Sequence, residues 1–153
     1  MKDNTILIWQ YLRPLLVENV ELQAAMNTNS IFPLVAKEGT EYPFIIFSRD
    51  NLLPQYTKPV CGGWDNNIVV SVRVYSNDYS QSINIANIVR NALEWQVVEN
   101  EDIKIHPIEL QSCYESFNDD GYCQTLTFNV VAEWNKNIES TFMVVSSINI
   151  YIY

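Results

Sequence analysis

The sequence predicts an α+β domain, in which a mainly antiparallel sheet carries one long helix on a face and an N-terminal helix beside it. Three observations predict this class. An alternating, strand-like segment at residues 67–76 leads into a helix-like segment at 78–94. Two further strand-like segments, at 103–117 and 122–134, are joined by a turn sequence, and a helix-like stretch at 4–18 precedes them all. Strands with helices segregated to one face are typical of the class.

The length predicts a single domain. The chain has 153 residues, of which 48% are hydrophobic. A chain of this size buries about 70% of its unfolded surface, which is enough to form a core without disulfides or a metal. We expect one domain over residues 1–135, followed by a β-prone extension at 136–153.

Residues 4–18 predict an amphipathic helix, because Ile6, Trp9, Leu12 or Arg13, and Leu16 recur at helical spacing on one side. Pro14 interrupts this pattern. A proline inside a helix removes one backbone donor and clashes with the preceding turn. We therefore expect the helix to kink or split near this position.

Short elements are expected next. The sequence predicts one or two helical turns at 18–26, an extended start at 31–33, a polar turn at 37–40 and a short strand at 44–48.

Residues 50–67 predict a long loop, because they contain Pro54, Pro59 and the pair Gly62-Gly63. A loop of this length in a compact domain is usually functional or mobile. Its large apolar side chains either cap the core or form a contact surface, and buried aromatic anchors dominate the energetics of protein interfaces. The candidate interface residues in this loop are Leu52, Leu53, Pro54, Tyr56 and Trp64.

The segment at 67–76 is the clearest strand, since its apolar residues alternate with polar or mixed ones and so define one core-facing side. These apolar residues are Ile68, Val70, Val72 and Val74. Ser76 or Asn77 can cap the helix expected at 78–94. The apolar stripe of that helix, which should lie on the sheet, consists of Ile85, Ile88, Val89, Ala92 and Leu93.

The sequence Asn118-Asp119-Asp120-Gly121 predicts a tight hairpin turn, in which Gly121 supplies the positive φ that such turns need. Pro107 lies within the strand expected at 103–117. A proline cannot donate a hydrogen bond to a neighbouring strand, so we expect a bulge or an edge at this position.

The odd number of cysteines, Cys61, Cys113 and Cys123, predicts reduced thiols of the kind found in a cytoplasmic compartment. If the residues flanking the turn pair directly, Cys113 lies opposite Leu126. A bridge between Cys113 and Cys123 is then unfavourable on geometric grounds.

Residues 142–153 have strong β propensity and little charge. Such a segment promotes aggregation when it is unpaired. We expect it to pair either with the chain's own sheet or with a neighbouring subunit, and both outcomes remain open. Its candidate interface residues are Phe142, Val144 and Ile150.

The charge balance argues against a direct grip on nucleic acid. The formal net charge is −9, and the 9 basic residues are scattered singly along the chain. Such a surface repels a phosphate backbone. The sequence also contains no apolar run of the roughly 18 residues that a membrane-spanning helix requires.

No residue pattern predicts a catalytic residue, a cofactor or a metal ligand. His106 is the only histidine and has no acid or nucleophile near it in the sequence. A general base needs a positioned partner and a metal needs several ligands, so we expect a structural or solvated role. Asp119 and Asp120 are ordinary turn residues. Gly62-Gly63 lacks the spacing of a phosphate-binding loop.

Several local sequences follow one another in a recognisable order. They are Leu15-Leu16, Ile31-Phe32-Pro33, Tyr42-Pro43-Phe44-Ile45-Ile46-Phe47, Val70-Ser71-Val72-Arg73-Val74-Tyr75-Ser76, Ile85-Ala86, Val89-Arg90-Asn91-Ala92-Leu93, Tyr114-Glu115 and Leu126-Thr127-Phe128-Asn129-Val130. In this order the chain resembles the small phage tail-completion proteins, also called head–tail joining proteins or minor tail components, which are related in architecture to tail terminators.

The resemblance implies a non-enzymatic protein of a virion or prophage. Members of this family commonly assemble as hexameric rings at the end of the tail tube next to the head. It implies homo-oligomers, other phage tail or connector proteins as partners, and assembly in the cytoplasm of a bacterial host. The family offers no catalytic residues. The chain departs from it after residue 135.

Two other kinds of function stay open. One is a monomeric binding module that recruits an extended peptide by adding it as a strand to a sheet edge. The other is an enzyme that uses carboxylates, with Glu109, Glu115, Asp119 and Asp120 as the candidates. Such an enzyme should hold at least one carboxyl group of strongly shifted pKa in a cleft.

Overall fold

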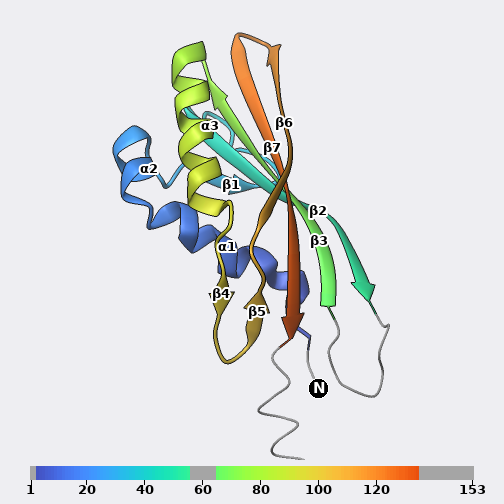
Figure 1. Cartoon of the computed structure of the whole chain (residues 1–153). Helices are drawn as coiled ribbons and strands as arrows, with labels where there is room; N and C mark the ends of the chain where they lie inside the picture. The colour runs from blue at the N-terminus through green and yellow to red at the C-terminus, as the bar shows by residue number, and fades with distance from the viewer. Residues whose placement is uncertain (1–2, 56–64, 135–153) are drawn as a thin grey trace, which may run out of the picture.

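The computed structural model describes residues 3–55 and 65–134, and Figure 1 shows their arrangement. The elements in chain order are a 3-10 turn η1 (Thr5–Leu7), α1 (Ile8–Val17), α2 (Val20–Ala25), β1 (Ile31–Pro33), β2 (Phe44–Gln55), β3 (Asp65–Ser76), α3 (Tyr79–Leu93), β4 (Val98–Glu99), β5 (Ile103–Ile105), β6 (Glu109–Asn118) and β7 (Gly121–Trp134).

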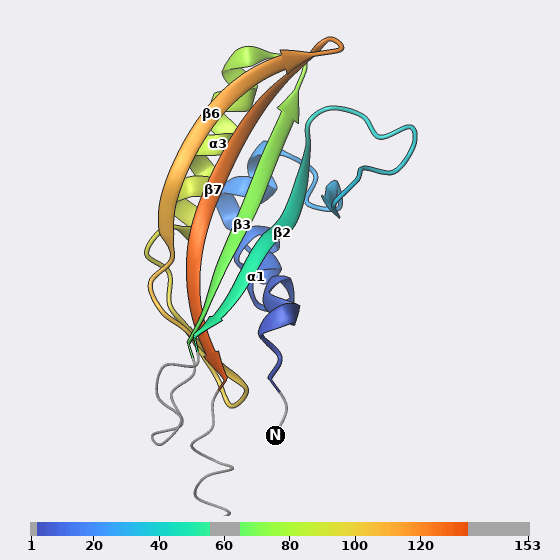
Figure 2. The ribbon, with the colours of Figure 1, turned by 90° about the vertical axis from the view of Figure 1, so that its right-hand side faces the viewer.

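The described strands form one sheet of seven, in the order β1-β2-β3-β7-β5-β4, with β6 also paired to β7. The β1–β2 pair is parallel and the other pairs are antiparallel. Because β5 and β6 pair with opposite ends of β7, they follow one another along the same side of that strand. The sheet is strongly twisted and curls into a half-barrel (Figure 2).

The predicted fold class, an α+β domain with one long helix on a face and an N-terminal helix, is wrong. The protein is mostly β, with strands in 46% of the described chain. The three α-helices of the described residues are short, and α3 has only 15 residues. The central strands are longer than their apolar patterns indicate, and a long twisted sheet curls rather than staying flat under one helix.

The extra strand length comes largely from residues 50–55, which were expected to lie in a loop. They form the second half of β2 and pair with β3, across a bulge between Arg49 and Asn51. Pro54 fits into this strand because β2 is an edge there, so its missing N–H leaves no ladder bond unmade on the open side. The hydrogen-bond partners supplied by β3 outweigh the local loop signals.

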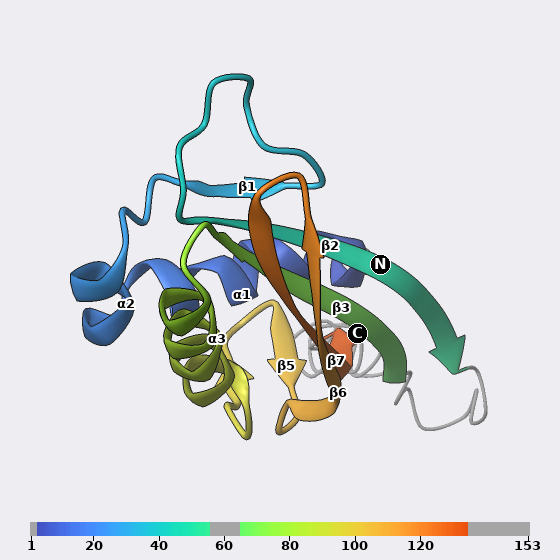
Figure 3. The ribbon, with the colours of Figure 1, turned by 90° about the horizontal axis from the view of Figure 1, so that it is seen from above.

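One face of the sheet carries the core, and the helices gather on that side (Figures 1 and 3). We call it the inner face. Burying each of its large apolar side chains stabilises the fold by about 1.5–3 kcal/mol. The fully buried residues include Ile68, Val70, Val72 and Val74 of β3, Phe128, Val130 and Ala132 of β7, Ile85 and Val89 of α3, and Ile8, Leu12 and Leu16 of α1.

The N-terminal helix forms, and most of its predicted apolar side faces the core, since Leu12 and Leu16 are fully buried and Trp9 packs against the core cluster. Ile6 is the exception, because it is 62% exposed and Ile8 is buried instead. Pro14 lies inside α1, which continues without a break from Ile8 to Val17. The predicted split is therefore wrong. Pro14 is exposed, and the buried leucines on either side of it hold both halves of the helix against the core.

Several local predictions are confirmed. The helical turns at 18–26 form α2, the segment at 31–33 forms β1, and the helix expected at 78–94 forms α3. The turn at 37–40 closes with a hydrogen bond from the Thr40 N–H to the Lys37 carbonyl (3.1 Å).

The prediction that Ser76 or Asn77 caps α3 is wrong, because Asp78 is the N-cap residue and no side chain makes a capping bond there. Ser76 instead braces the turn before the helix. Its hydroxyl oxygen accepts a hydrogen bond from the Asp78 N–H (3.1 Å), and the hydroxyl donates to the Gln81 side chain (2.6 Å).

The hairpin between β6 and β7 forms at the predicted place, with Asn118 paired to Gly121. The positive φ angles, however, belong to Asp119 (49°) and Asp120 (68°), and not to Gly121. Asn and Asp tolerate this region better than most side chains do. Gly121 is needed for another reason, because a Cβ there would lie 2.5 Å from the hydroxyl oxygen of Tyr42.

The strand predicted at 103–117 is divided at Pro107 into β5 and β6, as the proline suggested. A further bulge lies between Leu110 and Ser112. Beyond it the register pairs Cys113 with Leu126, as predicted, and Cys113 is a free, exposed thiol.

Candidate functional site

The face of the sheet opposite the helices is the first candidate for a functional surface (Figure 2). We call it the outer face. It carries the alternate residues of β3 and β7, which pair directly across the two strands. At one end Tyr75 lies opposite Cys123, and at the other end Asp65 lies opposite Glu133. The two ends therefore differ in chemistry.

An aromatic cluster of Tyr42, Phe44 and Tyr75 covers the first end. The rings of Tyr42 and Phe44 stack with centroids 5.5 Å apart, and those of Phe44 and Tyr75 with centroids 4.9 Å apart. Burial raises the pKa of Tyr75, and the neighbouring Cys123 thiol raises it further. Because Tyr42 also contacts Gly121, the cluster joins the segment before β2 to the hairpin turn.

A small polar network lies in the middle of the outer face. Asp50, the residue in the β2 bulge, accepts hydrogen bonds from the hydroxyl groups of Ser48 (2.7 Å) and Ser71. Both serines are buried. The bulge thus places a carboxylate where it satisfies two buried hydroxyl groups, each of which would be costly to leave unpaired.

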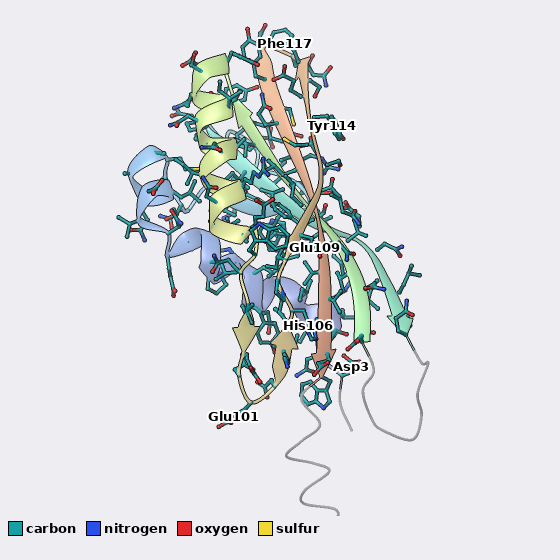
Figure 4. All side chains as sticks on the ribbon, viewed as in Figure 1. Asp3, Glu101, His106, Glu109, Tyr114 and Phe117 are labelled. Atoms are coloured by element: carbon teal, nitrogen blue, oxygen red, sulfur yellow. The ribbon has the colours of Figure 1, made fainter. Side chains whose placement is uncertain are left out.

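An Asp–His–Glu cluster, made of Asp65, His106 and Glu133, occupies the other end. The potential ligand atoms of its three side chains all lie within 4.8 Å of one another. His106 Nε2 is 3.3 Å from a Glu133 carboxylate oxygen. The backbone N–H of His106 donates a hydrogen bond to the Val131 carbonyl (2.9 Å). Figure 4 shows His106 at the lower part of the sheet. These are residue types that could together hold a divalent metal ion.

The cluster borders a cavity of about 470 Å³, which is lined by Asp65, Trp95, His106, Pro107, Glu109, Asn129 and Val131. Sequence reasoning assigned His106 a structural or solvated role, because no acid lies near it along the chain. The structure brings it two carboxylates from β3 and β7 instead. Only the strand register could have revealed this grouping.

A third polar group ties β6 to α3. The Tyr79 hydroxyl donates to a Glu115 oxygen (2.9 Å), and the Gln124 amide donates to the same oxygen (3.0 Å). The hydrogen bond from Gln124 has the larger effect in lowering the pKa of Glu115, and the bond from Tyr79 lowers it further. The bond to Glu115 in turn raises the pKa of Tyr79. The group lines a cavity of about 230 Å³ together with Ser116, Phe117 and Tyr122.

The sheet also has two open edges within the described residues. Strand β6 pairs only with β7, and nearly all of its residues are exposed. On the opposite side, β1 pairs with β2 only at residues 45–47. The remainder of β2, residues 49–55, has no described strand on its far side. Open edges carry unpaired backbone groups and readily pair with other chains.

The predicted interface residues fall into two groups. Leu52 is half-buried and packs against the core, whereas Leu53, which is 54% exposed, and Pro54 lie on the open part of β2. The other predicted interface residues lie outside the described residues, and they are Tyr56, Trp64, Phe142, Val144 and Ile150.

The four carboxylates that an enzyme was expected to use occupy different settings. Asp119 and Asp120 form the hairpin turn, Glu115 binds Tyr79 and Gln124, and Glu109 borders the larger cavity. The pKa of Glu115 is lowered, which favours the charged form over a proton-donating one.

None of the helices in the described part of the chain has the length and apolar character needed to span a bilayer.

Comparison with known proteins gives a likeness of fold. No known protein family matches the sequence, and no curated protein matches it either. Among solved structures, the fold is similar to that of a chain in the structure titled "Virion of native gene transfer agent (GTA) particle", with a TM-score of 0.54 and 15% sequence identity. The similar region covers 80% of this chain and 94% of that chain.

Proposed function

We propose that this chain is a structural subunit of a phage-like particle, which completes the tail or joins head to tail by forming a ring at the end of the tail tube. Its partners are further copies of itself, six in a ring, and other tail or connector proteins. It acts without catalysis, without a membrane and without a direct grip on nucleic acid. It is assembled in the bacterial cytoplasm and becomes part of the virion.

Two findings support the particle. The fold is similar to that of a chain in a gene transfer agent particle over most of both chains. The local sequences that resemble tail-completion proteins include 42–47, which leads into β2, and 70–76, which lies in β3, and these two strands pair with one another. The net charge of −9 suits a protein that surrounds DNA without gripping it.

The observation that carries the ring is that, among the described residues, the sheet has open edges on two opposite sides. A closed ring requires a heterologous interface, in which one surface of each subunit meets a different surface of the next. Strand β6 on one side and residues 49–55 of β2 on the other are two such surfaces. Pairing them would satisfy the backbone groups of both edges and continue the sheet from subunit to subunit.

The test uses one charged substitution at each edge of the full-length protein. Leu53→Glu lies on the β2 edge, and Tyr114→Glu lies on β6, where Tyr114 is 58% exposed. Each change should abolish rings in native mass spectrometry while leaving the fold intact. Mixing the two variants should restore one good interface and give heterodimers but no rings. Val20→Glu, at a residue of α2 that is 77% exposed, is the matched control and should assemble normally.

Rings of this kind can depend on the tail as a template, so the wild-type protein is also sedimented with purified tail tubes. A wild-type chain that stays monomeric and does not sediment with the tubes contradicts the proposal. If both edge variants still form rings, the protein is an oligomer, but its subunits do not meet through β6 and residues 49–55 of β2.

One observation favours a second candidate, a monomeric module that binds an extended peptide. Among the described residues, no second strand covers the edge of β6 along Glu109–Asn118, which is long enough to take a peptide strand. Tyr114→Glu on β6 distinguishes the two functions. A peptide-binding module would lose its ligand in this variant, and its state of assembly would not change.

A further inference from the structure

We propose that Asp65, His106 and Glu133 bind one divalent transition-metal ion, of which Zn²⁺ is the representative. The three residues come from three separate parts of the chain, and they meet at one end of the outer face. The proposal does not depend on ring assembly.

The donor set fits that class of ion. Imidazole nitrogen and carboxylate oxygen are both donors that Zn²⁺ accepts, and three protein ligands leave one position for water or a further ligand. Mg²⁺ and Ca²⁺ prefer oxygen ligands alone, so the histidine favours a transition metal over them.

The spacing fits as well. Two ligands that are each about 2.1 Å from a tetrahedral ion lie roughly 3.4 Å from one another. His106 Nε2 and the Glu133 oxygen are 3.3 Å apart, which matches this spacing. The ligand atoms of all three residues lie within 4.8 Å of one another. A change of side-chain rotamer at Asp65 would therefore bring its carboxylate to the distance that a shared ion requires.

The electrostatics of the pair give a reason for a cation. Asp65 and Glu133 are directly opposite one another on adjacent antiparallel strands. Like charges in that arrangement are destabilising. Lys104 also lies opposite Glu133, in the register of β5 and β7, but it is His106 that contacts the Glu133 carboxylate. A bound dication would offset the repulsion that remains between the two carboxylates.

The surroundings allow an ion to enter and be held. The three side chains are only half-buried, and two of them, Asp65 and His106, line the cavity of about 470 Å³. The His106 backbone is fixed by its bond to the Val131 carbonyl, so the ring is already oriented toward the carboxylates. Trp95 lines the same cavity and can report binding through its fluorescence.

The experiment titrates ZnCl₂ into the full-length protein, with any affinity tag removed, by calorimetry and tryptophan fluorescence. Cys61 and Cys113 are replaced by serine throughout, because free thiols also bind Zn²⁺. One ion should bind per chain, and the melting temperature should rise by about 5–10 °C at a hundredfold excess over Kd. Asp65→Asn, His106→Gln and Glu133→Gln should each weaken binding tenfold or more.

Glu109→Gln is the matched control, since Glu109 borders the same cavity but is not in the cluster. It removes one negative charge and should change Kd by less than threefold. Without metal, Asp65→Asn should melt at or above the temperature of the unsubstituted protein, because it relieves the repulsion; this separates lost ligation from lost folding.

Three results would overturn the site. The first is no saturable binding of Zn²⁺. The second is equal weakening by Glu109→Gln, which would indicate general attraction to acidic surface. The third is binding that His106→Gln leaves unchanged, or that Mg²⁺ matches in affinity, because the imidazole would then not be a ligand.

Discussion

The inner and outer faces of the β3–β7 pair are built from the same two strands but behave differently. On the inner face the central side chains are apolar and buried, as Val72 and Phe128 show, and polar residues such as Gln124 appear only towards the ends of the strands. On the outer face neighbouring positions are a tyrosine and a thiol at one end and two carboxylates at the other. Each inner residue needs only to be apolar, whereas each outer residue acquires its role from the residue opposite.

The pleat of the strands separates the residues that stabilise the fold from those that form specific contacts. Alternate residues point to opposite faces, so a substitution on one face leaves the other nearly untouched. Inner substitutions should therefore cost stability in proportion to the volume removed, while outer ones should act through particular pairs.

Phe128→Ala should lower the free energy of unfolding by about 3–5 kcal/mol, because it leaves a large cavity in a fully buried site. The adjacent outer residue offers a matched comparison. Thr127→Ala, at a half-buried position, should cost no more than about 1 kcal/mol. Urea denaturation of both variants measures the difference. Similar losses for the two would mean that the faces are not independent.

Gly121→Ala should cost about 1–3 kcal/mol, because its methyl group would lie 2.5 Å from the Tyr42 hydroxyl oxygen and force the ring away. Adding Tyr42→Ala should remove most of the additional penalty. A double-mutant cycle by denaturation measures this coupling. Strictly additive losses would show that the two residues do not touch in solution.

Tyr75→Leu should cost about 0.5–1.5 kcal/mol, because it keeps much of the apolar volume but loses the stack on Phe44. Tyr114→Leu is the control on the same face, where the side chain is exposed. It should have almost no effect on the thermal midpoint. An equal loss at both positions would argue against a specific aromatic cluster.

The Glu115 group should produce the smallest effect, a pH dependence. Its folded-state pKa is lowered by the bonds from Gln124 and Tyr79. The charged form therefore adds stability that is fully present above the unfolded-state pKa of about 4.3, and that stability is lost as the pH falls through the lower folded-state pKa. Thermal melts between pH 6 and pH 2 follow it.

Glu115→Gln and Tyr79→Phe provide the controls for this pH dependence. The first removes the titrating group, and the second removes one of its two donors. Both should flatten the acid limb of the profile, the first more completely. A steeper limb in either variant would contradict the sign of the shift.

Local patterns predicted much of the inner face and little of the outer one. The alternation in β3, the stripe of α3, the hairpin at Asn118–Gly121 and the opposition of Cys113 to Leu126 all follow from short-range periodicity. The errors lie where distant segments decide the outcome. Residues 50–55 became strand because β3 offered them partners, and α1 ran through Pro14 because the core held both of its ends.

The fold class was missed for the same reason. The length that the strands reach when they pair decides whether one helix covers a flat sheet or several short helices cover a curled one. The β propensity of single residues does not predict that length. The candidate metal cluster was missed because Asp65, His106 and Glu133 are separated by tens of residues and meet only through register.

The burial of the central strands, the position of the hairpin turn and the acidic charge can be predicted from the amino-acid sequence alone. These properties are local or additive, since a period of two residues and a sum of charges need no knowledge of neighbours. The curl of the sheet, the open edges of its described strands and the residues that face one another across the outer face required the folded structure. Those depend on pairing between distant segments, where a shift of a single residue would move every side chain to the opposite face.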